Sequence, residues 1–217
     1  MRKLKKEAKN CLKKNNMSPV KYLEGIGLLG KKLVAAHCIW VSKRDINALK
    51  KHGVRIAHCP TADMKLADGV MPYRLLKESN LTMGLGTDGP SSNNNLDMFE
   101  AMKIASLLQK SVQGRQTAMP APEAFSMATR GGADALGLDL GIKEGNPADI
   151  VLVDLNRPEL TPHYNLVSDI VYSANGSCAD TVICDGRVLM ENRQVRDEDK
   201  ILEQARDAAR RLTSPDI

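Results

Sequence analysis

The stretch TMGLGTDGPSSNNNLDMFEAMKIASLLQ, residues 82–109, holds a short apolar segment, an acidic residue bracketed by glycines and a run with helical spacing of apolar residues. Residues 82–86 predict a strand, and residues 95–109 predict a helix. Between them lies Asp88, whose neighbouring glycines let the backbone approach a ligand closely. A strand, a loop and a helix in this order are the repeating unit of a parallel α/β sheet.

Two similar units precede this one. Residues 32–38 (KLVAAHC) form a short apolar run that predicts a buried parallel strand, and residues 42–52 predict the helix that follows it. Residues 54–58 (VRIAH) predict the next strand, and a loop and a helix at residues 72–79 complete the unit. Three such units in a row predict an α/β fold with a parallel sheet.

A polar residue stands at or just past the end of each predicted strand: His37, His58 and Asp88. Parallel strands place their carboxyl ends at one edge of the sheet, and α/β barrels assemble their active sites at that edge. We therefore expect these three side chains to converge.

Each of these residues also has a plainer interpretation. His37 has the chemistry of a general acid/base or a metal ligand, but one histidine after an apolar run is also typical of a structural residue. His58 precedes Cys59-Pro60, where a sharp turn alone explains the motif. Asp88 is suited to bind a divalent metal and to help generate hydroxide, or it belongs to an ordinary Asp-Gly turn. Ser92 offers a hydrogen bond to a polar ligand, or Ser92 or Asn93 caps the next helix.

The character of the chain changes after a predicted helix at residues 122–136. Turn-rich segments and β structure follow, including residues 150–154, residues 167–174 and residues 181–190, the last divided by an Asp185-Gly186 turn signal. A charged helix is expected at residues 197–212. The predicted divisions are an α/β domain, a β portion and a C-terminal helix, at residues 1–140, 141–195 and 196–217.

Composition excludes several classes of protein. With 217 residues, 42% hydrophobic and 26% charged, the chain is long enough to bury a core. The net charge of +5 comes with only 3% aromatic residues and no recognition motif, so we expect no nucleic-acid binding. The sequence contains no apolar run of about 18 residues, the length that a membrane-spanning helix needs, so we expect no membrane span. None of the five cysteines forms a CxxC pair, and reduced thiols favour a cytoplasmic location.

Four stretches resemble the second half of the deaminases of the amidohydrolase superfamily: AAHCIW, AHCPTADMKLADG, GLGTDGPSSNNNLDMFEAMKIASLLQK and GIKEGNPADIVLVDLNRPEL. The 5-methylthioadenosine/S-adenosylhomocysteine deaminases and their chlorohydrolase-like relatives are the most similar group. The Cys59-Pro60 pair also resembles guanine-type and triazine-type deaminases, so the resemblance does not decide which ring the substrate contains. The expected small molecule is a purine nucleoside or a related heterocycle.

The resemblance implies a fold and a set of roles. The fold is the C-terminal part of a (β/α)8 metal-dependent hydrolase barrel, strands 6–8, followed by a small β-sandwich portion. In the complete enzyme, Zn²⁺ or another divalent metal activates the water that displaces ammonia. Asp88 matches the metal-binding, proton-shuttling aspartate, and His37 matches the histidine that polarises the water or the intermediate. Ser92 matches a substrate-contacting serine, whereas His58 matches the histidine of strand 7, whose expected role is structural or in the outer shell of the site.

The same resemblance places other parts of the site upstream of this sequence. The His-x-His pair of strand 1, the metal-binding histidine of strand 5 and a nearby glutamate have no counterpart here. We therefore expect a fragment of a deaminase that does not hold metal alone, is inactive alone and depends on a complementary N-terminal chain or forms a homo-oligomer. The alternative is a non-catalytic scaffold or binding protein derived from the half-barrel.

Overall fold

The computed structural model describes residues 3–213, whose contacts divide the chain into two compact units. The first unit contains the described residues up to Leu140 together with Pro158–Gly176, and the second contains Gly141–Arg157 and the residues from Ser177 onward. Residues 158–176 thus pack with the first unit, although they lie inside the segment for which the sequence suggests a β portion. No helix of the described chain is long and apolar enough to cross a membrane.

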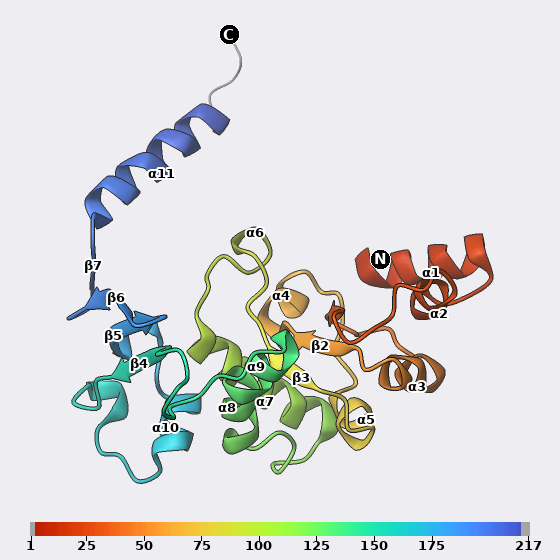
Figure 1. The fold of residues 1–217 in the computed structure, drawn as a ribbon, viewed down its shortest axis with the longest axis horizontal. Helices are drawn as coiled ribbons and strands as arrows, with labels where there is room; N and C mark the ends of the chain where they lie inside the picture. The colour runs from red at the N-terminus through yellow and green to blue at the C-terminus, as the bar shows by residue number, and fades with distance from the viewer. Residues whose placement is uncertain (1–2, 214–217) are drawn as a thin grey trace. The chain divides into compact units, whose positions relative to one another are not determined.

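The first unit is built on a parallel sheet of three strands, of which β2 and β3 are labelled in Figure 1. These are β1 (Val34–Ala36), β2 (Arg55–His58) and β3 (Met83–Leu85), paired in the order β1-β2-β3. The predicted α/β fold with a parallel sheet is confirmed. Because all three strands run in one direction, their carboxyl ends share one edge.

Helices surround this sheet, with α7, α8 and α9 packed on β3 and α2 packed on α3 (Figure 1). The helical elements of the first unit are α1 (Lys3–Asn15), α2 (Pro19–Gly25), α3 (Lys43–Lys51), α4 (Pro60–Lys65), α5 (Tyr73–Glu78), α6 (Pro90–Asn93), α7 (Met98–Gln113), α8 (Ala121–Ala128), α9 (Arg130–Leu136), η1 (Pro158–Leu160) and α10 (Leu166–Tyr172).

A shared apolar core fixes these helices on the sheet. Ile56 of β2 is fully buried, as are Leu76 of α5 and Val171 of α10. Helix α3 begins with a capping box, in which Ser42 and Asp45 satisfy each other's backbone N–H groups. Burial of apolar side chains such as Ile56, Leu76 and Val171 stabilises the fold by roughly 1.5–3 kcal/mol each.

The first strand is less buried than the sequence suggests. Val34 and Ala35 are half-buried and Ala36 is exposed. The prediction of a buried strand is wrong because β1 pairs with β2 on one side and has no strand on its other side within the described chain. β3 is the other edge of this sheet.

Two further predictions need correction. Residues 166–172 form helix α10, not a strand, because Asn165 caps it by accepting from the Ser168 N–H and Val171 turns into the core. The single helix expected at residues 122–136 is two helices, α8 and α9, which meet at Thr129 with φ −114° and ψ −95°.

Helix α9 approaches β3 more closely than side chains would allow. A Cβ on Gly131 would lie 2.5 Å from the Met83 carbonyl oxygen, and a Cβ on Gly84 would lie 2.9 Å from the Gly132 Cα. Glycines at these positions therefore let the helix contact the strand backbone directly. This contact fixes the strand that leads to Asp88.

The second unit contains a four-stranded antiparallel sheet and a long helix. Its elements, in sheet order and then chain order, are β4 (Ile150–Val153), β5 (Ala179–Cys184), β6 (Arg187–Glu191), β7 (Gln194–Val195) and α11 (Glu198–Thr213), with η2 (Gly176–Cys178) leading into β5. The expected turn between β5 and β6 is present, with positive φ at Asp185 (48°) and Gly186 (73°) as a tight hairpin requires.

Candidate active site

Two of the predicted site residues meet at the carboxyl edge of the parallel sheet. His37 directly follows β1, and Asp88 follows β3 after Gly86 and Thr87. The Nε2 atom of His37 lies 3.9 Å from an Oδ2 atom of Asp88, a distance too long for a direct hydrogen bond. Both side chains are partly accessible, at 25% for His37 and 31% for Asp88. Both side chains are therefore close together and reachable from solvent at this edge of the sheet.

The backbone is constrained where each of these residues leaves its strand. His37 has φ 68° and Asp88 has φ 64°, values in the left-handed region that residues other than glycine rarely adopt. The His37 N–H donates to the Ala57 carbonyl at 2.9 Å, and the Gly89 N–H donates to the Asp88 carboxylate at 2.7 Å. Such strain is common at functional sites, where the surrounding structure holds it in place.

A second carboxylate, which sequence reasoning missed, contacts the other side of His37. Asp63 of α4 is only 2% exposed, and its Oδ1 atom lies 2.8 Å from the His37 Nδ1 atom. The hydrogen bond to Asp63 is the main cause that raises the pKa of His37. Burial raises the pKa of Asp63, and the bond to His37 opposes that effect. His37 thus lies between two carboxylates.

A signal for Asp63 was present in the sequence. Pro60 is well placed to begin a helix, and Asp63 lies in the first turn of that helix, where a carboxylate is favoured. A prediction of only a sharp turn at Cys59-Pro60 does not include this short helix, α4. The helix brings Asp63 back toward the end of β1.

His58 is the last residue of β2, the strand between β1 and β3, and it is fully buried. Neither ring nitrogen has a hydrogen-bond partner in the described part of the chain. Burial, helped by the nearby His37, lowers the pKa of His58 to about 3. His58 is therefore neutral at pH 7.

Ser92 lies in α6, a single helical turn that follows Asp88, and is half-buried. The suggestion that Ser92 or Asn93 caps the next helix is wrong, because Asp97 caps α7 by accepting from the backbone N–H groups of Phe99 and Glu100. The Asn93 side chain is 5% exposed, and its amide atoms have no partner among the described residues.

The metal-binding capacity of these residues is limited. Residues 3–213 contain no cluster of three or more His, Cys, Asp or Glu side chains that would hold a metal ion. Zinc sites in proteins use three or four protein ligands, so His37 and Asp88 alone do not fit a complete site.

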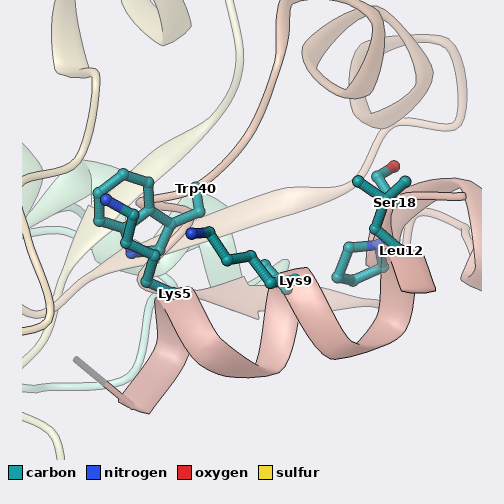
Figure 2. Close-up of a pocket in the computed structure, with 7 residues that line it drawn as sticks. Lys5, Lys9, Leu12, Ser18 and Trp40 are labelled. Atoms are coloured by element: carbon teal, nitrogen blue, oxygen red, sulfur yellow. The ribbon is translucent and has the colours of Figure 1, made fainter. Parts of the chain in front are cut away.

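Two hollows lie beside the amino-terminal helix α1. One, with a volume of about 360 Å³, is lined by α1 residues such as Glu7 and Cys11 and by His37 itself. The other, of about 210 Å³, is lined by Lys5, Lys9 and Leu12 of α1 and by Trp40. Figure 2 shows the three α1 side chains along one helix face, beside Trp40. The Lys5 ammonium lies 4.7 Å from the centre of the Trp40 ring. His37 thus lines the first hollow as well as facing Asp88.

Comparisons with known proteins show which family the sequence resembles. The family model described as "Amidohydrolase family" matches residues 3–189. A 5'-deoxyadenosine deaminase of Methanospirillum hungatei is 50% identical over 94% of this chain and 46% of that protein. A 5-methylthioadenosine/S-adenosylhomocysteine deaminase of Dictyoglomus thermophilum is 43% identical over 92% of this chain and 48% of that protein.

Solved structures of zinc-containing hydrolases are similar to this chain in fold. An adenosine deaminase from Xanthomonas campestris with bound zinc is similar with a TM-score of 0.91 and 32% identity, over 97% of this chain and 49% of that one. An atrazine chlorohydrolase from Arthrobacter aurescens complexed with zinc has a TM-score of 0.83 and 28% identity, over 93% and 46% of the two chains. The chain thus spans about half the length of the relatives it matches.

Proposed function

Because this chain belongs to the amidohydrolase family, we propose that it is the C-terminal half of an adenosine-type deaminase, a hydrolase of non-peptide carbon–nitrogen bonds. The observation that carries the proposal is the approach of His37 and Asp88 to 3.9 Å at the carboxyl edge of the sheet. Relatives of 43–50% identity named as deaminases of adenosine derivatives support the choice of substrate class.

The proposed reaction replaces an amino group on a purine-like ring with a hydroxyl group. Water adds to the ring carbon that bears the amino group, and ammonia leaves. Asp88 accepts a proton from the water and returns it to the leaving nitrogen, a role that suits an accessible carboxylate. His37 hydrogen-bonds the oxygen that adds to the ring, and Ser92 contacts the substrate.

The incomplete ligand set has a direct consequence. His37 and Asp88 do not hold zinc by themselves, so we assign no step to a metal on this chain. The zinc in the related structures was found with chains about twice as long. We propose that a complementary N-terminal chain supplies the remaining ligands.

The open sheet supports this dependence on a partner. β1 and β3 are the two edges of the parallel sheet, and each has a neighbour on one side only in residues 3–213. Unpaired strand edges expose backbone N–H and C=O groups that pair with other chains. We therefore propose that the chain alone releases no ammonia and self-associates, and that the complementary half pairs with both edges.

A non-catalytic scaffold or binding protein is the second candidate. The lack of a three-ligand metal cluster in the described part of the chain favours it. The two candidates differ in what they do with a partner: a half-enzyme gains deaminase activity, whereas a scaffold binds without chemistry. A cytoplasmic location, supported by five free cysteines, suits either one.

The experiment that tests the proposal uses the upstream half of a close relative. The chain is mixed with the segment of the Methanospirillum hungatei deaminase that precedes its matched region, in the presence of Zn²⁺. Ammonia release from adenosine, 5'-deoxyadenosine, methylthioadenosine and S-adenosylhomocysteine is measured. Activity only in the mixture supports the half-enzyme, and a stable complex without activity supports the scaffold.

A further inference from the structure

We propose that Asp63 is a positioning residue for His37, whose ring it holds in the tautomer with the proton on Nδ1 and with Nε2 turned toward Asp88. The inference about the ring stands on the geometry of this chain alone. Its catalytic consequence rests on the proposed deaminase function.

The two nitrogens of the ring face two different carboxylates. Nδ1 lies 2.8 Å from Asp63 Oδ1, which is hydrogen-bond distance, and Nε2 lies 3.9 Å from Asp88 Oδ2, which is not. An ionised carboxylate only accepts hydrogen bonds, so the proton of this bond is on Nδ1. In the neutral ring, Nε2 then has its lone pair free to accept a hydrogen bond at the edge where Asp88 lies.

The Asp63 carboxylate does not belong to a wider network of hydrogen bonds among the described residues. Its side chain is almost fully buried, and its second oxygen, Oδ2, has no hydrogen-bond partner within the described residues. Burying a carboxylate is costly unless it is paired. The bond to His37 is the contact that offsets this cost, so the two side chains act as a pair.

The backbone that carries Asp63 is held firmly. The Asp63 N–H donates to the Cys59 carbonyl at 3.0 Å, and the Asp63 carbonyl accepts from the Asp68 N–H at 2.9 Å. Pro60 and Ala62 of the same helix are buried. A group that orients another must itself be fixed, and α4 meets this condition.

The competing explanation is that Asp63 merely anchors α4 to the end of β1. Both explanations predict lower stability when the carboxylate is removed, so stability alone does not separate them. Both also place the proton of His37 on Nδ1, since the same hydrogen bond is made in either case. They differ over catalysis, because an anchor has no effect on kcat beyond its effect on folding, whereas a positioning residue lowers kcat when it is removed. The His37 tautomer depends on an oxygen at residue 63 that accepts the hydrogen bond from Nδ1, and not on the negative charge of Asp63.

The first test observes the ring directly in the isolated chain. Long-range ¹H–¹⁵N NMR spectra of the histidine-labelled chain are recorded at alkaline pH, and the His37 signals are assigned by their loss in His37→Gln. We expect the Nδ1–H pattern in the wild type and in Asp63→Asn, whose amide oxygen still accepts. In Asp63→Ala the signal shifts to the Nε2–H tautomer.

A matched control is Asp134→Ala on α9, an exposed carboxylate whose loss leaves the His37 signals unchanged. A wild-type chain with the proton on Nε2 overturns the proposal, and so does Asp63→Ala with an unchanged Nδ1–H pattern. If Asp63→Ala does not fold, the wild-type and Asp63→Asn spectra still decide the question, because both must show Nδ1–H.

The second test measures deamination in the mixture with the complementary half. Asp63→Ala is expected to lower kcat by about 10²-fold with little change in KM, because a misaligned group costs roughly that factor. Asp63→Asn is expected to stay within a few-fold of wild type. Equal kcat in Asp63→Ala and wild type overturns the catalytic consequence. A silent wild-type mixture, with the expected spectra, refutes the deaminase function and leaves the orientation of His37 supported.

Discussion

The Nε2 atom of His37 lies 3.9 Å from the Oδ2 atom of Asp88, although these residues follow the two outer strands of the sheet. The central strand between them ends in His58, which is fully buried. His37 and Asp88 therefore meet over the end of β2. The sheet itself sets the spacing of the pair, because β1 and β3 are each hydrogen-bonded to β2.

Asp88 is expected to be essential in the assembled enzyme. Asp88→Asn keeps the size of the side chain but removes its ability to take up a proton, so ammonia release by the mixture should fall by about 10²–10⁴-fold. Asp134→Asn, at an exposed carboxylate on α9, is the matched control and should retain full activity. An Asp88→Asn mixture with more than about a tenth of wild-type activity would contradict a proton-transfer role.

His58 is expected to make the chain less stable in acid. Its pKa is about 3 in the folded chain and about 6.5 when unfolded, so between these values the unfolded state binds the extra proton. Stability from this residue is thus fully present above pH 6.5 and is lost as the pH falls toward 3. Between pH 7 and pH 5 the wild type should lose about 2 kcal/mol relative to His58→Asn.

Urea unfolding at both pH values checks this prediction. The matched control is His163→Asn, at an exposed histidine, and its stability should follow that of the wild type at both pH values. If the wild type and His58→Asn lose stability in parallel, His58 is not the buried neutral group described above.

The contact between α9 and β3 is expected to tolerate no side chain. Gly131→Ala places a methyl group 2.5 Å from the Met83 carbonyl oxygen, and relief of that overlap should cost about 1–3 kcal/mol of unfolding free energy. Gly25→Ala, where no atom lies within 4 Å, is the control and should cause no loss. Equal stability of the two variants in urea would show that α9 does not contact β3 so closely.

A polar cluster is expected to hold α10 on α7. The fully buried Ser106 hydroxyl donates to the Met119 carbonyl at 2.7 Å and lies 2.9 Å from the Tyr172 hydroxyl. Lys110 contacts both hydroxyls. Ser106→Ala leaves the Met119 carbonyl without this donor and should cost about 1–3 kcal/mol.

The effect of Ser106→Ala should be local as well as global. Amide hydrogen exchange in α10 is expected to quicken in this variant, whereas Ser111→Ala, at an exposed serine of the same helix, should leave it unchanged. Unchanged exchange in Ser106→Ala would mean that the apolar core alone retains α10.

The strand ends were predictable from the sequence because each apolar run stops at a polar residue. His37, His58 and Asp88 could be placed at one edge without any knowledge of contacts. Asp63 could not be paired with His37 in this way, since their bond joins the end of β1 to α4, a helix three elements later in the chain. Only the path of the chain through α4 determines that contact.

Burial and local structure were harder to predict. The run at β1 resembles a buried strand in composition, yet its accessibility depends on whether a neighbouring strand is present. Val167, Ile170 and Val171 are typical of a strand by residue type, but their spacing fits one face of a helix, and Asn165 supplies the cap. In α10 the periodicity and the cap outweighed β propensity.

The most direct test of the central claim is ammonia release from 5'-deoxyadenosine by the chain alone, by the complementary half alone and by their purified complex with Zn²⁺. If the chain is half of a deaminase, the complex should release ammonia, each half should be silent, and Asp88→Asn should abolish the gain. A stable complex that releases no ammonia from any of the adenosine derivatives, or a chain that is active alone, would contradict the account.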